Sequence, residues 1–547
     1  MIWCAAGSPS IDSRRAVVVA RAYALRSMPL LDWIVVFGYL AIVAVIGFVA
    51  SRRHDRADAF FLAGRSIPSW AASFSVVATV LSAATFIGMP QQAYRGDLTY
   101  MVFKFAGLPA LIVVGIFFLP AFYRSTHASI YGIVRERYGP GAGAAAGISF
   151  LIGRLLASGA RLFMAALAVS WVLFGSADPG PLAVTIAMVA VGTALYAIAG
   201  GIRAIIWTDV LQAIVAAVVG VVALIVLWNL VDRPLDDVIA LLQAGGESGR
   251  DKLRMFDATP DPSKSFGVWS GLFGLPVFLV AAYAVDQDHV QRLLVCKTPK
   301  DGLRAGVLSN LIGWPLAFVF LAIGLLLWVE TQVHGTVRVG ADGDDRAVMI
   351  QFMLTELPLG IRGLMVAGLL AAAMSSLDSA LNALAATTMN DLVQPSRKRR
   401  GQAPLDDRTA TRWSRCSMIG WAVLLAGVAF ALSIWQVRSG KTLLEFALGV
   451  MTYAYAGLLG VFVVALFTRR GSGRSVVAAL IAGALVILFT DRNVQAAFGI
   501  DSYLPGLAIG WRLMLGAGLS AAIAAIPGIS ETTASGTGTR RGRLPMP

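Results

Sequence analysis

Apolar blocks of about 20 residues, the length of a helix that crosses a bilayer, recur throughout this chain of 547 residues. No other feature limits the possible folds as strongly. Only 14% of the residues are charged and the mean hydropathy is +0.73, whereas an average soluble domain contains about 25% charged residues. A soluble monomer is therefore excluded. Backbone polar groups inside a bilayer must form hydrogen bonds within the protein, so spanning segments are either helices or strands of a closed barrel. The chain lacks the alternating pattern of barrel strands. The sequence therefore predicts an all-α polytopic membrane protein.

About thirteen transmembrane helices are predicted from the apolar blocks and their charged flanks. The expected spans lie near residues 30–50, 70–92, 99–122, 143–174, 180–199, 205–230, 268–291, 304–329, 361–391, 413–436, 442–467, 474–490 and 505–526. Outside the spans, the polar loop 231–267 and the tail 527–547 are both too short to fold as a catalytic domain.

Basic residues determine the expected orientation. The chain has a formal net charge of +14, and its Lys and Arg residues concentrate in alternate loops, for example at 397–400. Loops rich in Lys and Arg stay in the cytoplasm, so we expect a plasma-membrane protein with its N-terminus outside and its C-terminus cytoplasmic. The loop 231–267 is then external and the tail 527–547 cytoplasmic. No basic run interleaved with aromatic residues indicates nucleic acid binding, and no obligate protein partner is evident.

The N-terminal extension, residues 1–29, carries four arginines, which is unusual for an external tail. Met28 directly precedes the first span, so we expect translation to begin there, with a cleaved signal peptide as the alternative.

The chain offers no pattern for catalysis or for a transition metal. Its three cysteines and four histidines are scattered singly, without metal-ligand spacing. No nucleophile with a matching base and no phosphate-binding loop is present. We therefore expect no enzyme activity and no cofactor.

Two spans carry small polar residues at mid-membrane, where a polar group without a partner is costly. The first contains Ser and Thr residues between 73 and 85, and the second contains a run between 375 and 382. In the second, Ala372, Ser375 and Ser376 share one helical face with Ser379. Hydroxyls that only bond back to their own helix would explain one such residue, but a whole face of oxygens favours a site for a hard cation such as Na⁺.

The first of these spans is also expected to be broken. Residues 78–82, Ala-Thr-Val-Leu-Ser, combine β-branched and small polar residues at mid-span. Discontinuous helices of this kind free backbone carbonyls for ions in secondary transporters.

Four motifs carry a resemblance to a known family. They are GMPQQAY at 88–94, GGIRAIIWTDVLQ at 200–212, DQDHVQRLL at 286–294 and GLLAAAMSSLDSALNALAATTMNDL at 368–392. In this order, and across about residues 30–490, they resemble the sodium:solute symporter family. This family includes the sodium/glucose, sodium/proline, sodium/monocarboxylate, sodium/iodide and sialic acid symporters.

The resemblance implies a LeuT-type core of two inverted five-helix repeats, at 70–230 and 268–467, with one helix before (30–50) and two after (474–526). Solute and ion would bind between the broken first and sixth core helices, and alternating access would import the solute together with Na⁺. By alignment to the family's shared sodium site, the ligands are Ala78, Leu81, Ala372, Ser375 and Ser376. The last three lie on the helical face identified above.

A second ion site is implied near Asp209, which matches an acidic position of the family, and near Asp378 and Ser379, one turn beyond the shared site. Two alternatives remain open. Asp209 follows Gly200 and Gly201 closely and could cap the start of its helix, and Asp378 could be a neutral group bonded to Asn382.

The favoured solute is a small organic anion, in particular a carboxylate. Lys104 lies where sugar- or sialic-acid-binding members of the family carry Glu or Gln. Arg154 and Arg161 share a face of the third core helix, and an arginine at membrane depth must face a partner or a water-filled cavity. The sialic acid symporters place a carboxylate-binding Arg on this helix. Snorkelling would explain Lys104 instead, and pairing with a protein acid or backbone carbonyls would explain each arginine.

Further solute contacts are expected from Ser82 and Thr85 beside the break, and from Tyr283. Sugar-transporting relatives carry a stacking tyrosine where this chain has Ala282, so a close match to sugar symporters is disfavoured. The remaining alternatives are a symporter of a neutral sugar, amino acid or vitamin, an uncoupled facilitator, and a transporter-like sensor.

Overall fold

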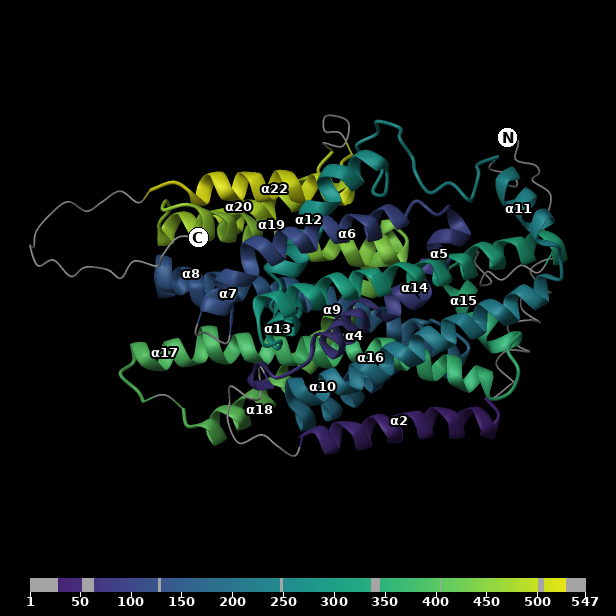
Figure 1. Ribbon diagram of the computed structural model, residues 1–547, viewed down its shortest axis with the longest axis horizontal. Helices are drawn as coiled ribbons and strands as arrows, with labels where there is room; N and C mark the ends of the chain where they lie inside the picture. Colours follow the sequence, from purple (N-terminus) through teal and green to yellow (C-terminus); the bar gives the residue numbers. More distant parts are fainter. Residues whose placement is uncertain are drawn as a thin grey trace, which may run out of the picture.

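The protein is a bundle of long helices that run side by side, as the computed structural model shows (Figure 1). The structure describes residues 28–51, 63–125, 129–245, 249–335, 345–403, 405–499 and 506–527, and these contain no strand. The expectations for the N-terminal extension and the C-terminal tail fall mostly on residues 1–27 and 528–547, outside the described residues.

The first half of the chain forms the helices up to α11. Their bounds are α2 (Leu30–Ser51), α4 (Ser69–Val80), α5 (Ala83–Arg95), α6 (Met101–Val113), α7 (Leu119–Arg124), α8 (Tyr131–Tyr138), α9 (Pro140–Phe174), α10 (Pro179–Val231) and α11 (Leu235–Ala244). A short 3₁₀ turn, η1 (Ala63–Arg65), precedes α4, and a π-helical turn, η2 (Val114–Phe118), joins α6 to α7.

The second half of the chain forms the helices from α12 to α22. Their bounds are α12 (Leu275–Ala284), α13 (Gln287–Leu294), α14 (Pro299–His334), α15 (Val348–Thr355), α16 (Ile361–Thr387), α17 (Gln394–Arg399), α18 (Asp407–Ser439), α19 (Leu443–Phe467), α20 (Gly473–Phe489), α21 (Arg492–Ala497) and α22 (Ile509–Ala524). The short turns are η4 (Ser270–Gly274), η5 (Asp345–Ala347) and η6 (Thr388–Val393).

Eight of the described helices are long and apolar enough to cross a membrane, and two bent helix pairs would raise that number to 10. Three shorter apolar segments add to them: the first part of α10, Pro179–Leu195, and the helices Gly473–Phe489 and Ile509–Ala524. The exact count of thirteen spans stays a prediction. One expected boundary differs: the spans near 180–199 and 205–230 belong to one helix, α10, which continues through Gly200 and Gly201.

The two bent pairs are α4 with α5 and α12 with α13. The break in each pair borders the candidate functional site described below. The axes of α4 and α5 differ by 60°, and those of α12 and α13 by 66°. Ser82, at the first break, has an extended backbone, so α4 stops at Val80 and α5 starts afresh. The expected break within residues 78–82 is thus confirmed. At the second break Asp286 caps α13 by accepting a hydrogen bond from the Asp288 backbone N–H.

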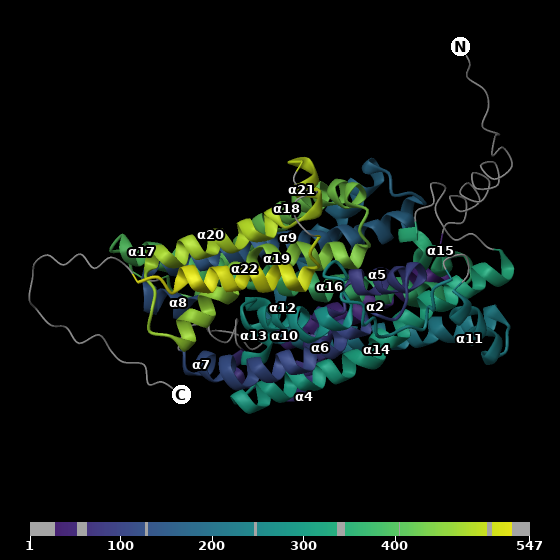
Figure 2. The ribbon, with the colours of Figure 1, turned by 90° about the horizontal axis from the view of Figure 1, so that it is seen from above.

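The first described helix, α2, lies at the opposite side of the bundle from α20 and α22 (Figure 1), and in the view from above α20 and α22 face the viewer (Figure 2). It is tied to α16 by Asp32, which is fully buried. One carboxylate oxygen of Asp32 accepts hydrogen bonds from the backbone N–H groups of Gly360, at 2.7 Å, and Gly363, at 2.9 Å. These are orphan donors at a helix N-terminus, where an anion is favourable. Asp32 therefore fixes the start of α16 against α2.

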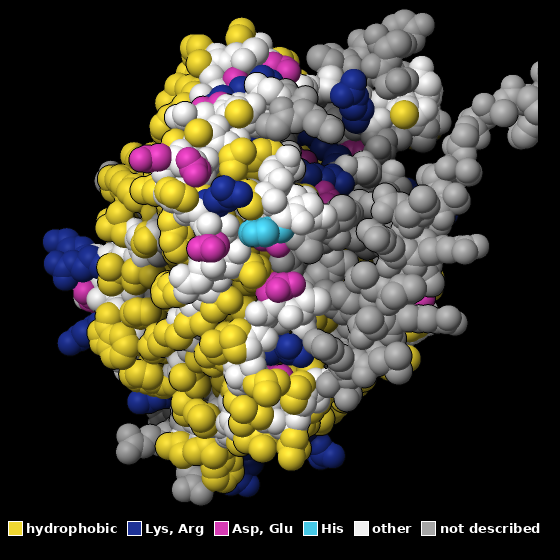
Figure 3. Space-filling view, turned by 90° about the vertical axis from the view of Figure 1, so that its right-hand side faces the viewer, with side chains coloured by type: hydrophobic (Ala, Val, Ile, Leu, Met, Phe, Trp, Pro, Cys, Tyr) yellow, Lys and Arg dark blue, Asp and Glu magenta, His cyan; other side chains and the backbone are white. Residues whose placement is uncertain are grey.

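The segment after α11 is fastened to the end of α5. Lys252 donates to the backbone carbonyls of Tyr94 and Gly96, each at 2.9 Å. Arg254 forms an ion pair with Asp97 at 2.9 Å. Figure 3 views this end of the bundle and shows charged side chains interspersed among hydrophobic ones, beside residues that the structure does not describe.

Candidate functional site

The break between α4 and α5 faces the polar stripe of α16. The Ser82 backbone N–H bonds to the Val80 carbonyl instead of continuing the helical ladder, which leaves the Ala78 carbonyl free for another donor. The Ser375 hydroxyl takes that place, donating to the Ala78 carbonyl at 2.9 Å. The neighbouring Ser376 hydroxyl donates to the Thr79 carbonyl at 3.4 Å.

Four of the five expected sodium ligands are therefore brought together. Both serine hydroxyls also approach the Ala372 carbonyl, at 3.3 Å from Ser375 and 3.1 Å from Ser376. The fifth residue, Leu81, is buried at the break itself. Carbonyl and hydroxyl oxygens in such an arrangement are the donors that a hard cation prefers.

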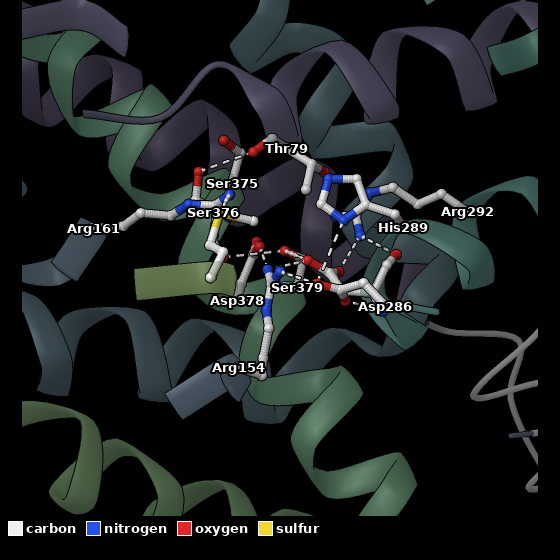
Figure 4. A network of polar contacts seen from close by, with 12 residues as sticks. Thr79, Arg154, Arg161, Asp286, His289, Arg292, Ser375, Ser376, Asp378 and Ser379 are labelled. Atoms are coloured by element: carbon white, nitrogen blue, oxygen red, sulfur yellow. Dashed lines mark hydrogen bonds and ion pairs between the residues drawn. The ribbon is translucent and has the colours of Figure 1, made fainter. Parts of the chain in front are cut away.

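A network of buried ion pairs lies next to this group (Figure 4). Arg154 of α9 reaches across to the second break and pairs with Asp286, at 3.1 Å, and with Asp288. The hydroxyl of Tyr455 donates to Asp286 at 2.6 Å. Ser379 of the α16 stripe donates to Asp288 at 3.3 Å, so the stripe and the network are connected.

Arg292 continues the network to α10. It pairs with Asp288 and, at 3.2 Å, with Asp209. Asp209 also accepts a hydrogen bond from the Ser75 hydroxyl at 2.5 Å. Because α10 extends from Pro179 to Val231, Asp209 lies in the interior of this helix. The interpretation of Asp209 as a helix cap is therefore wrong.

A cavity of about 100 Å³ lies between the two breaks and helices α6, α9, α14 and α19. Five of the expected solute contacts line it: Ser82, Thr85, Lys104, Arg161 and Tyr283. The rest of the wall is largely aromatic and aliphatic, with His289, Ser309 and Asn310 as further polar residues. A concave, mostly apolar pocket with a few polar groups is typical of a small-molecule site.

Two cations in the cavity wall have no carboxylate partner among the described residues. Lys104 is 8% exposed, and its ammonium lies over the ring of Tyr100, 5.8 Å from the centroid. Arg161 is also 8% exposed. One of its terminal nitrogens approaches the sulfur of Met451 at 3.9 Å, and the other has no hydrogen-bond partner within the described part of the chain. In contrast, Arg154 does not line the cavity, because Asp286 and Asp288 hold its guanidinium.

Asp378 lies on α16 beside Asp209 and Arg292. One of its oxygens accepts a hydrogen bond from the Ser379 backbone N–H at 2.5 Å, and the other has no partner among the described residues. Both polar atoms of the Asn382 side chain also lack a partner there. The structure thus contains no hydrogen bond between Asp378 and Asn382.

Sequence reasoning missed the ion-pair role of Asp288 and Arg292. Both belong to the motif at 286–294, and their i,i+4 spacing on a helix was a usable signal for a pair. Ser309 and Asn310, two adjacent polar residues in an apolar span, gave a weaker signal for their place in the cavity wall.

Comparison with known proteins agrees with this geometry. The model of the Sodium:solute symporter family matches residues 60–483. The chain is 26% identical to the sodium/sialic acid symporter of Proteus mirabilis (strain HI4320) over 478 residues, which cover 85% of this chain and 90% of that protein. It is also 26% identical to the sodium-coupled monocarboxylate transporter 1 of Homo sapiens, with 85% of this chain and 73% of that protein covered.

A solved structure has a similar fold. The outward-open, substrate-bound state of a Na⁺-coupled sialic acid symporter superposes with a TM-score of 0.76 at 24% sequence identity. The match covers 91% of this chain and 97% of that one. The expected LeuT-type helical fold is confirmed.

Proposed function

The chain belongs to the sodium:solute symporter family, and from this premise we propose that it imports a small carboxylate together with Na⁺ by alternating access. The family consists of membrane transporters, so the protein is a multi-pass transporter and not an enzyme. Na⁺ is its coupling ion. The class of solute and the residues that bind solute and ions are the proposed part.

The observation that carries the carboxylate assignment is the pair of cations in the cavity wall. Lys104 and Arg161 are both buried, and neither has a carboxylate partner among the described residues. Removing a charge from water costs several kcal/mol unless a counter-charge is supplied. A solute carboxylate in the cavity would supply it, and the planar guanidinium of Arg161 is suited to binding carboxylate through two hydrogen bonds.

The shape and lining of the cavity favour a compact solute. Its volume is about 100 Å³, and Phe103, Phe278 and Met451 present apolar surface. A short carbon skeleton would pack there, with its carboxylate toward the cations. Ser82, Thr85 and Tyr283 would add polar contacts. Two of the related proteins named above are symporters of sialic acid and of monocarboxylates, which supports an acid as the solute.

For the ions, we assign the shared sodium site to the carbonyls of Ala78, Leu81 and Ala372 and the hydroxyls of Ser375 and Ser376. The contacts between these serines and the freed carbonyls support the assignment. A second ion would bind near Asp209, Asp378 and Ser379, next to the ion-pair network.

We further infer that α11 and the end of α5 lie outside and that the C-terminus lies in the cytoplasm of the cell. The distribution of Lys and Arg between alternate loops supports this orientation, and it places the protein in the plasma membrane.

The test is uptake into proteoliposomes under an inward Na⁺ gradient, with an equal K⁺ gradient as the control. Acetate, lactate, pyruvate, succinate and sialic acid are first screened by thermal shift in NaCl and in KCl. The acid that stabilises the protein most is then compared with its amide, which has nearly the same shape but no charge. We expect sodium-dependent uptake of the acid and no competition by the amide. Equal competition by the amide would refute an anion site, and equal uptake in K⁺ would indicate an uncoupled facilitator.

A further inference from the structure

Basic residues gather where α17 ends and α18 begins, at the same end of the bundle as α8 (Figure 1). Residues 394–416 contain seven of them and only two acidic residues. The seven are Arg397, Lys398, Arg399, Arg400, Arg408, Arg412 and Arg415. The loop between the helices folds back onto α17, because the Arg397 guanidinium donates to the Ala403 carbonyl at 3.0 Å. The positive charges of both helices are thereby held at one place.

Three of these arginines lie on one face of α18. Arg408, Arg412 and Arg415 are exposed and spaced i, i+4 and i+7, which is the spacing of one helical face. We call these three residues the arginine face. The same spacing continues through Ile419 and Val423, which are 54% and 68% exposed. Because α18 is apolar enough to cross a membrane and only 33% of its apolar window is buried, the arginine face stands at the end of a stripe that faces lipid.

The position of the arginine face along α18 matches the headgroup layer of a bilayer. Trp413 is 56% exposed, and tryptophan is enriched at the membrane surface. At about 1.5 Å per residue, Arg415 lies about 6 Å before Ile419, and Arg412 about 10 Å before it. The headgroup layer is about 5–8 Å thick on each side of the hydrocarbon core. Arg415 is therefore level with the headgroups, and the long side chain of Arg412 can reach them.

The arginine face also lacks a counter-charge from the protein. None of its three residues forms an ion pair with an acid in the part of the chain that the structure describes. Asp406 is engaged in capping α18, since it accepts a hydrogen bond from the Thr409 backbone N–H at 3.2 Å. Arg408 lies in the first turn of α18, where the helix dipole disfavours a cation. An anion from outside the protein would compensate both the charge and the dipole.

We propose that the arginine face binds the phosphate of an anionic phospholipid whose acyl chains lie along the apolar stripe from Ile419 onward. Arg412 and Arg415 are i,i+3 neighbours, with about 5–6 Å between their Cβ atoms, so both guanidiniums can reach one phosphate. The planar guanidinium suits phosphate through two parallel hydrogen bonds. A free phosphate ion would gain only these polar contacts, whereas a lipid also gains the contact with the apolar stripe. The basic residues of α17 attract anionic lipid to the same surface.

The experiment measures lipid preference at Cys416, which is exposed and directly follows Arg415. The full-length protein, with Cys4 replaced by Ser, is labelled there with bimane; Cys296 is buried. It is reconstituted in KCl buffer into phosphatidylcholine vesicles that contain a minor share of nitroxide-labelled phosphatidylglycerol or, for comparison, nitroxide-labelled phosphatidylcholine. Nitroxides quench bimane at short range. We expect stronger quenching by phosphatidylglycerol, and the preference should fall about tenfold in the double variant Arg412→Gln, Arg415→Gln.

The matched control is the double variant Arg399→Gln, Arg400→Gln, which removes the same charge from the same hairpin but not from the arginine face. It should change the preference about twofold or less, because these exposed residues act only through a potential that salt screens. Equal losses in the two double variants would show that only the total surface charge matters, and the site would be refuted.

Two further results would overturn the proposal. Equal quenching of the wild type by phosphatidylglycerol and phosphatidylcholine would show that no anionic lipid is selected. In a separate arm inorganic phosphate is added, and we expect it to leave the preference largely intact. Full competition by inorganic phosphate would show that the arginines bind a free ion and that the apolar stripe contributes nothing. The measurement requires neither solute nor sodium, so its result is independent of the proposed function.

Discussion

The Ser375 hydroxyl donates to the Ala78 carbonyl at 2.9 Å, across 297 positions of the sequence. This contact joins the helix that carries the polar stripe to the carbonyls freed by the break. When an ion enters the shared site, the same two oxygens are available to it as ligands.

Replacing Ser376 by Ala removes one further oxygen, so the sodium concentration for half-maximal uptake should rise about fivefold to tenfold. Sodium titration of uptake measures this shift. Unchanged sodium dependence in the double variant Ser375→Ala, Ser376→Ala would refute the site.

Asp209 is expected to act in ion coupling. The variant Asp209→Asn keeps a group that can accept a hydrogen bond from Ser75 but removes the charge that faces Arg292. Uptake driven by sodium should fall at least tenfold, while size-exclusion profiles and membrane insertion remain like those of the wild type. Wild-type kinetics in this variant would show that its charge has no part in coupling.

Lys104 and Arg161 are expected to bind the solute anion. Lys104→Gln and Arg161→Gln should each raise the KM for the identified acid by roughly tenfold or more, since a hydrogen bond to a charged group contributes about 1.5–3 kcal/mol. Arg304→Gln is a suitable control because Arg304 is exposed, with 76% of its side chain accessible. If both cavity variants transport the acid like the wild type, or if the solute is a neutral sugar, the carboxylate assignment is wrong.

Arg154 should instead prove to be structural. Arg154→Gln leaves Asp286 and Asp288 buried without their shared cation, and breaking a buried ion pair from one side costs about 3–5 kcal/mol. We expect the melting temperature of the variant to fall strongly. The acid should still raise that temperature more than its amide does, as in the wild type. Normal stability together with an altered preference between acid and amide would show that Arg154 binds the solute.

The loop after α11 should loosen in acid. Hydrogen bonds from Lys264 and Thr259 lower the pKa of Asp257 below its usual range. The ionised form is thus favoured in the folded loop, and its contribution is present above the unfolded pKa of about 3.9 and is lost as the pH falls further. Hydrogen exchange of residues 249–268, corrected for the intrinsic rate, should speed up as the pH falls from 5 to 3. In Asp257→Asn this pH dependence should be weaker, and only the part due to Asp261, whose pKa is lowered by hydrogen bonds from Ser263, should remain.

The parts of the site that follow local rules could be predicted from the sequence. The face shared by Ala372, Ser375 and Ser376 follows from helical periodicity, and the break near Leu81 follows from the local mixture of β-branched and small polar residues. Both depend on neighbours within one or two turns.

The partners of the buried charges could not be predicted in this way. Arg154 and Asp286 are 132 positions apart, and no local pattern states whether an intramembrane arginine will face a solute or an acid of the same protein. The same limit applies to Tyr39 of α2, which is buried because residues of α10 and α16 pack against it. Tertiary packing alone decides which of these groups are left without partners.

The hydrogen bonds from Gly360 and Gly363 to Asp32 also impose an order of events during synthesis. Asp32 enters the membrane with α2, whereas Gly360 is made 328 residues later. At about 5–20 residues per second, the ribosome needs roughly 15 to 65 s to reach it. Throughout that interval the carboxylate must remain hydrated at the membrane surface or protonated, so α2 cannot settle at its final depth before α16 has emerged. In this sense α2, although it is inserted long before α16, is fixed only together with it.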